Sequence, residues 1–185
     1  IANPNFFPSY AVVSNPLDKR SSDGLNLAVF ASDRIWFTDQ ISILGGVRLD
    51  KYTSDFTSTN TTTGIPNPTL STTNYLASPK ASLIWEPVNW QTYYATYARS
   101  YSNLAGEFVT NALNPIANTT LEPEENDLFE LGAKISLLNG RLGLTGALFR
   151  VDKGNSVQTD PTTGDLVQTN ENQRVQGVEL GVPGL

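Results

Sequence analysis

The feature that most constrains this chain is a pair of long alternating runs within residues 126–152. They flank Leu138-Asn139-Gly140-Arg141, and Asn-Gly between two β-like runs is the strongest short-range hairpin signal. In the first run every second residue is apolar: Phe129, Leu131, Ala133, Ile135 and Leu137. The intervening residues include Glu130 and Lys134. Because successive side chains of a strand point to opposite faces, the run predicts a strand with one apolar and one polar face.

The length of these runs allows two architectures. A strand of about 12 residues rises roughly 40 Å, whereas strands of soluble proteins usually have about 5–6 residues. Tilted by about 45°, such a strand would cross a bilayer hydrocarbon layer of about 30 Å. A long hairpin of a soluble sandwich is the alternative, and this stretch alone does not decide between the two.

The same alternation predicts further strands along the chain. With the hairpin they make about seven, and their ranges are 25–37, 41–52, 75–85, 90–101 and 172–180. Two residues fit this pattern poorly. Pro79 is unusual in a central strand because it has no N–H to donate. Asp33 interrupts an apolar face, which indicates either a β-bulge or a position outside the apolar band.

The connections between these strands alternate in length. Short turns are expected at 38–40, 86–89 and 138–141, and long polar loops at 53–74, 102–125 and 153–171. Aromatic residues flank the short turns, as in an interfacial girdle: Trp36, Phe37, Trp85 and Trp90. Outer-membrane barrels have short periplasmic turns, long extracellular loops and alternating strands. Because lipid-exposed sheet edges must be paired, we expect an all-β, antiparallel up-and-down segment of a larger transmembrane barrel.

Composition excludes several classes of function. The 185 residues include no Cys and no His, so a Ser-His-Asp triad, a zinc site and disulfides are not expected. The net charge of −6 argues against a nucleic-acid partner. No apolar run is long enough for a transmembrane helix. We therefore predict no enzyme activity, no catalytic residues, no metal site and no cofactor.

Three segments resemble TonB-dependent outer-membrane receptors, most closely the ferric-siderophore branch. They are LNLAVFASDRIWFTDQISILGGVRLDKY, SPKASLIWEPVNWQTYYATYARSY and LEPEENDLFELGAKISLLNGRLGLTGALFRVDKGN followed by QRVQGVEL. The most specific motifs are the Leu-Glu-Pro-Glu run 121–124, the Glu-x-Gly-x-Lys pattern 130–134 and the Gly-Val-Glu-Leu run 177–180. The resemblance covers about residues 25–180.

This resemblance implies a barrel of about 22 strands with a plugged lumen in the bacterial outer membrane. Residues 1–24 would be an extracellular loop remnant, 25–180 part of the receptor β-barrel and 181–185 a truncated tail. The implied function is active import of a ferric siderophore. The implied partners are outer-membrane lipid and the TonB-ExbB-ExbD complex, which would act through a plug absent from this chain. We expect the chain to be a fragment.

Candidate ligand-binding residues lie where the fourth strand ends: Arg99, Tyr101 and, in the following loop, Phe108. Ferric catecholates are anionic and carry flat rings, so arginine charge and aromatic stacking suit them. In the structural alternative, Arg99 pairs with a loop carboxylate such as Glu107 and the tyrosines belong to the aromatic girdle. We favour this alternative because girdle tyrosines are common in such barrels.

Two other functions fit parts of the pattern. A passive outer-membrane porin would share the barrel wall but need no energy source. A secreted all-β adhesin or carbohydrate-binding sandwich would explain the Thr- and Asn-rich loops. It would explain neither the wholly apolar strand faces nor the placement of all long loops at one end.

Overall fold

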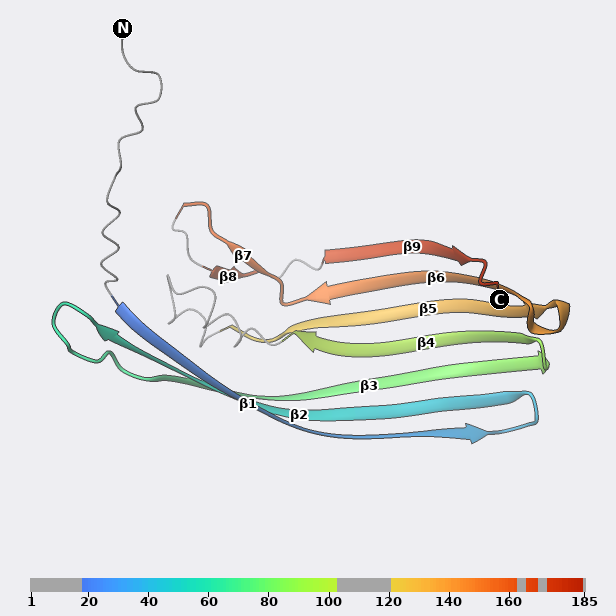
Figure 1. The fold of residues 1–185 in the computed structure, drawn as a ribbon, viewed down its shortest axis with the longest axis horizontal. Coiled ribbons are helices and arrows are strands. Elements are labelled where there is room, and N and C mark those ends of the chain that lie inside the picture. The colour runs from blue at the N-terminus through green and yellow to red at the C-terminus, as the bar shows by residue number, and fades with distance from the viewer. Residues whose placement is uncertain (1–17, 103–120, 163–165, 170–172, 185) are drawn as a thin grey trace, which may run out of the picture.

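The computed structural model describes residues 18–102, 121–162, 166–169 and 173–184 (Figure 1). The strands are β1 (Asp18–Trp36), β2 (Ile41–Asn60), β3 (Leu70–Val88), β4 (Gln91–Ser102), β5 (Glu124–Leu137), β6 (Leu142–Gly154), β7 (Val157–Thr159), β8 (Leu166–Gln168) and β9 (Gln173–Gly181). A 3-10 turn, η2 (Leu138–Gly140), joins β5 to β6. Within these described ranges, no helix has the length and hydropathy needed to cross a membrane.

Seven of the strands form one antiparallel sheet in the order β1-β2-β3-β4-β5-β6-β9. Each strand pairs with its neighbour in the chain, except that the small β7-β8 sheet intervenes between β6 and β9. Figure 1 shows the resulting single layer of long, gently bent strands, with the short connections at one end. This up-and-down sheet confirms the predicted fold class. The described part of the sheet is open, because β1 and β9 are its two edges.

The pairing register gathers most apolar residues on one face, although Leu44, Ile84 and Phe149 lie on the other. One continuous row passes from strand to strand through Ile43, Leu83, Ala95, Leu131, Leu148 and Val178. These side chains are not covered by a second layer, since Leu131 is 59% and Val178 65% exposed. An apolar surface of this extent needs an apolar surrounding. The alternative of a two-layer sandwich therefore disagrees with the structure.

The prediction of a loop at 53–74 is wrong for most of these residues, which form strand. Strand β2 continues to Asn60 and β3 begins at Leu70, so only the intervening residues turn the chain. The extended part is rich in Thr and Ser, whose alternation carries no apolar signal, although β-branched Thr favours strands. It has a small core of its own, in which the buried Phe56 packs against Tyr52 and Leu70.

Other strand ends also differ from the prediction. Strand β1 begins at Asp18, so residues 18–24 are strand and not irregular loop. The predicted loop 153–171 contains the β7-β8 pair. Gln168 fixes this pair, because its side-chain amide donates to the carbonyls of Glu122 and Asn155, each at 2.9 Å.

The structure decides two local predictions, the hairpin turn at Asn139-Gly140 and the place of Pro79 in its strand. The Asn-Gly hairpin is confirmed: Asn139 and Gly140 adopt left-handed backbone angles, with φ of 55° and 88°. Pro79 lies within β3, and the ladder between β3 and β4 ends at Lys80 and Ala98, next to this residue without an N–H.

Replacing Phe56 by Ala tests whether it holds the extension of β2 and β3 together. We expect a loss of about 3 kcal/mol in the local opening free energy and roughly hundredfold faster amide exchange at residues 54–56. Hydrogen exchange on the full-length protein measures this. Ile65→Ala, at the exposed tip of the same connection, is the control and should leave exchange unchanged. Equal exchange in both variants would contradict the assigned core.

Candidate functional site: the inner wall and its upper rim

The polar face of the sheet is held together by side-chain bonds between neighbouring strands. Ser82 and Thr96 share a hydrogen bond of 2.8 Å between β3 and β4. The Tyr94 hydroxyl donates to Glu130 Oε1 at 2.7 Å between β4 and β5. Because these polar groups lie opposite the exposed apolar row, this face is the inner wall of a membrane-spanning sheet.

An arginine cluster marks the short-turn end of this wall. Arg34 Nε donates to Ser42 Oγ at 2.9 Å, and the same guanidinium forms an ion pair with Glu86. The guanidinium also lies 4.0 Å from the ring centroid of Trp36. The cluster joins β1, β2 and β3, and Ser42 within it is fully buried. It therefore serves as a structural link, not as an open binding site.

Two aromatic rings on the inner wall lie over glycines of the adjacent strand. A Cβ on Gly132 would come within 2.3 Å of the Tyr94 ring, and one on Gly177 within 2.8 Å of the Phe149 ring. Only glycine allows rings to approach the neighbouring backbone this closely. The Tyr94 and Phe149 rings therefore pack directly against the backbone of the neighbouring strand.

A pocket of about 350 Å³ opens on the inner wall beyond the last paired residues of β3 and β4, where β4 nears its end. Its lining combines charge, hydroxyls and aromatic rings: Asn26, Arg48, Asp50, Tyr52, Leu76, Ser78, Ser100 and Tyr101. Arg48 donates from Nε and Nη2 to the two carboxylate oxygens of Asp50, both at 2.8 Å. The side chain of Arg48 remains 51% exposed, so its outward N–H groups are open to a ligand.

The structure places two of the three sequence-predicted ligand residues on one face of β4. Tyr101 borders this pocket but alternates onto the same face as Arg99. Arg99 lies on the opposite, apolar-face side, because it alternates with Ser100 and shares the parity of Tyr97. Phe108 and the expected partner Glu107 lie outside the described residues.

Arg99 is the centre of an ion-pair cluster above the apolar row. Its Nε and Nη2 donate to the two oxygens of Asp127 at 2.7 and 2.6 Å, and Nη1 lies 3.2 Å from Glu125 Oε2. Tyr97 donates its hydroxyl to Asp127 at 2.9 Å. The hydrogen bonds from Arg99 hold the pKa of the Asp127 carboxyl below its usual value.

The pocket residues Arg48, Asp50 and Tyr52 were not among the sequence candidates. The signal that could have found them is parity: all three share a face with the polar residues of β2, opposite Val47 and Leu49. Arg99 is also a basic residue near a strand end, but it alternates onto the apolar face.

These features define a class. A single antiparallel layer with a polar, pocketed inner wall, an exposed apolar outer face and short turns at one end is the wall of an outer-membrane β-barrel. The family described as TonB dependent receptor-like, beta-barrel matches residues 2–184, and the chain belongs to it. The protein is thus an outer-membrane protein of a receptor family.

Individual relatives agree with this assignment. The chain is 31% identical over 159 residues to the metal-pseudopaline receptor CntO of Pseudomonas aeruginosa, with 85% of this chain and 22% of that protein covered. It is 29% identical over 178 residues to the catecholate siderophore receptor Fiu of Escherichia coli, with 85% and 23% covered. The chain thus spans less than a quarter of the length of these curated relatives.

A solved structure shows the same strand arrangement. The siderophore receptor PiuA of Acinetobacter baumannii superposes with a TM-score of 0.74 at 28% identity, covering 89% of this chain and 24% of that one. These comparisons favour neither a passive porin nor a secreted sandwich. The family is one of receptors and transporters.

Replacing Asp127 by Asn tests the cluster around Arg99. We expect a loss of about 1–3 kcal/mol in unfolding free energy at neutral pH, because the guanidinium loses its two-oxygen partner. A carboxyl with a lowered folded-state pKa stabilises above its unfolded pKa, and this contribution disappears as the pH falls through the folded value. Wild type and variant should therefore converge in acid.

Urea unfolding of the full-length receptor in detergent, measured from neutral pH to about pH 3, provides the readout. Asp39→Asn, in the short turn at the other end of the sheet, is the matched control. A constant difference at every pH would show that Asp127 acts through packing and not through its charge.

Proposed function

We propose that this chain forms part of the wall of an active importer for ferric siderophores. In this proposal the chelate is bound from outside the cell by the inner wall and the long loops. Energy comes from the TonB-ExbB-ExbD complex, acting through a plug that belongs to the rest of the receptor. No bond is made or broken in the cargo, so no catalytic group is needed.

Family membership is the observation that carries this proposal. The names of the relatives agree with it, since Fiu is a catecholate siderophore receptor and PiuA a siderophore receptor. CntO is named for a different chelate, metal-pseudopaline. The chemical class of cargo that these names share is a metal bound by an organic chelator.

We assign the cargo contact on this part of the wall to the pocket around Arg48. Asp50 fixes the guanidinium of Arg48 from one side, and the exposed side can donate to an anionic oxygen of the chelate. Tyr52 offers aromatic surface beside it, suited to flat chelating rings. Tyr101 alternates onto the face of Arg99, so its role as a ligand residue stays a prediction. Arg99, engaged by two carboxylates, is assigned a structural role, and Phe108 stays a prediction.

Uptake measurements test the proposed transport. Cells that depend on the full-length receptor should accumulate radioactive iron supplied as a ferric catecholate. This uptake should stop when the TonB system is deleted. Continued uptake without TonB would indicate passive diffusion and contradict the proposal.

A binding experiment tests the pocket. Replacing Arg48 by Ala in the full-length receptor should weaken binding of the ferric chelate by roughly tenfold, the effect of one lost charge-assisted contact. Quenching of tryptophan fluorescence by the chelate gives the affinity. Arg99→Ala is the matched control, and we expect its affinity to equal that of the wild type. If Arg99→Ala weakened binding of the chelate and Arg48→Ala did not, the ligand site would lie at Arg99 and not at Arg48.

A further inference from the structure

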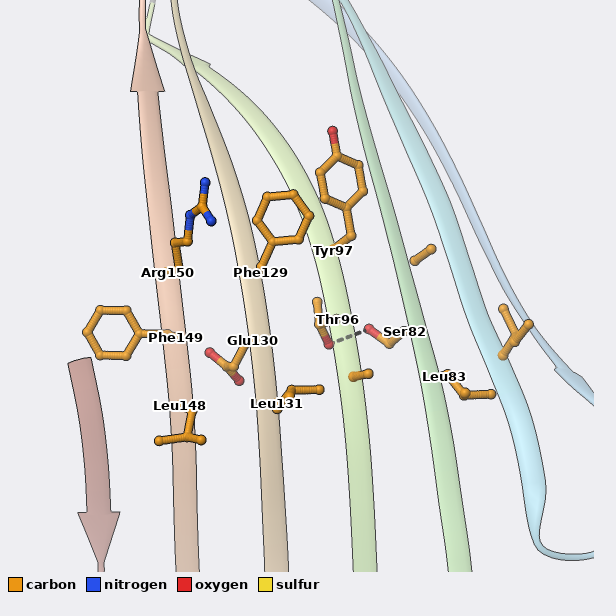
Figure 2. Close-up of a pocket in the computed structure, with 13 residues that line it drawn as sticks. Ser82, Leu83, Thr96, Tyr97, Phe129, Glu130, Leu131, Leu148, Phe149 and Arg150 are labelled. Carbon is orange, nitrogen blue, oxygen red and sulfur yellow. Dashed lines mark hydrogen bonds between the residues drawn. The ribbon is translucent and has the colours of Figure 1, made fainter. Parts of the chain in front are cut away.

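The cargo pocket lies where two neighbouring strands of the sheet stop pairing. Figure 2 shows the 2.8 Å hydrogen bond between Ser82 and Thr96, which joins β3 to β4 on the inner wall where their ladder is intact. The ladder ends at Lys80 and Ala98, and Figure 1 shows the two strands separating beyond that point. The pocket has β3 on one side and the end of β4 on the other. In this part of the two described strands, no paired residues fix the distance between them.

The end of β4 is held from its other side, by β5. The last four residues of β4 pair with the first four residues of β5 in an unbroken register. Arg99 adds ion pairs to Glu125 and Asp127 across the same two strands. The β4 side of the pocket, which includes Ser100, therefore follows the position of the beginning of β5.

One side chain on β8 fixes the segment that leads into β5. The Gln168 amide forms two hydrogen bonds with the backbone of Glu122: Nε2 donates to the carbonyl at 2.9 Å, and Oε1 accepts from the N–H at 3.2 Å. Nε2 also donates to the carbonyl of Asn155 at 2.9 Å. A primary amide has two N–H donors, and both are used here. The β7-β8 pair is thereby attached to the chain two residues before β5 begins.

Further contacts join the same two segments. Asn155 Nδ2 donates to the Pro123 carbonyl at 3.3 Å, and the Val157 N–H donates to Glu124 Oε1 at 3.2 Å. The other carboxylate oxygen of Glu124 forms an ion pair with Lys153 at 2.8 Å. Because Glu124 is only 9% exposed, water competes little for these contacts. Together with the bonds of Gln168 they form what we call the β5 clamp, which joins residues 122–124 to residues 153–157 and 168.

We propose that Gln168 is a positioning residue for the cargo pocket, an inference that rests on the proposed function of that pocket. The β5 clamp fixes the beginning of β5, and β5 fixes the end of β4. The end of β4 in turn sets the width of the pocket opposite β3. The β7-β8 pair thus limits the size of the chelate that the pocket admits, although none of the residues of the pair lines the pocket.

Hydrogen exchange on the full-length receptor without cargo tests the link from the clamp to β4. Gln168→Glu keeps the size of the side chain but removes both N–H donors, so amide exchange at the end of β4 should become about tenfold faster. Gln158→Glu, the same change at an exposed position of β7, is the control and should leave exchange at the wild-type rate. Equal exchange in the two variants would overturn the inference.

A milder variant covers the case in which Gln168→Glu does not fold. Asn155→Asp removes one hydrogen bond of the β5 clamp, the bond to the Pro123 carbonyl. It should accelerate exchange at the end of β4 by a smaller factor of about threefold. Wild-type exchange in Asn155→Asp would likewise count against the clamp.

Affinity for two cargo probes tests the link from β4 to the pocket. The probes are the ferric complex of a tris-catechol chelator and the same complex with a tert-butyl group on each ring. The wild type and Gln158→Glu should bind the smaller complex about tenfold more tightly. Gln168→Glu should lose most of this preference, because the end of β4 is free to move away from β3. A purely structural role of Gln168 would weaken both affinities equally, and an unchanged ratio would overturn the inference.

Arg48→Ala separates this inference from the proposed function. If Arg48→Ala binds both probes like the wild type, the pocket is not the cargo site, and the inference fails with that assignment. If Arg48→Ala weakens binding but Gln168→Glu keeps the size preference, the cargo site stands and only the positioning role of Gln168 is wrong. Weaker binding in Arg48→Ala together with a lost size preference in Gln168→Glu supports both.

Discussion

Backbone pairing between consecutive strands is the constraint on which the rest of this structure depends. Each strand of the main sheet bonds to the next in a register that keeps the two faces apart, from β1 through β6 to β9, and the one printed shift lies between Trp85 and Val88 at the short-turn end of β3. A shift by one residue would move every apolar side chain of a strand into the polar wall. The apolar outer surface, the polar inner wall and the pocket on it are all consequences of this one register.

The faces and the short turns were predictable from sequence because both depend on local signals. Alternation marks a strand wherever one side is apolar, and Asn139-Gly140 marks its turn. The extension of β2 beyond Tyr52 was not predictable in this way, because both of its faces are polar apart from Phe56. Outside the apolar belt, strands are stabilised by their neighbours, and a single strand's pattern does not reveal this.

The candidate site shows the same limit at the level of single residues. Arg99 and Arg48 are both arginines within strands, and composition does not distinguish them. Register does: Arg99 lies opposite Asp127 on the apolar side, whereas Arg48 lies among polar residues of the inner wall. The alternation of β4 puts Arg99 on the side of Tyr97, which is the side away from the lumen. The contact of Arg99 with two carboxylates depends on pairing across strands, which only the structure provides.

The position of Asp33 shows how the sheet is set in the membrane. One row of paired residues crosses the sheet from Asp33 on β1, through Tyr97, to Arg150 on β6. No register shift interrupts the pairing of β1 with β2, so the bulge considered for Asp33 is absent. The row crosses five spacings between neighbouring strands, each about 4.8 Å, so it is about 24 Å long. Because the strands tilt by about 40°, its two ends differ in height along the membrane normal by roughly 15 Å.

Along β1 that height corresponds to about six residues, so the upper edge of the apolar belt should fall near Leu27. The exposed apolar residues of this face begin at Leu25 and Leu27, in agreement with the tilt. Asp33 therefore lies toward the short-turn end of the belt, although it shares a row with Arg150 at the long-loop end. Arg150 limits the apolar belt on β6, whereas Asp33 interrupts the belt on β1. Both positions have the same cause, because rows of paired residues cross the membrane obliquely.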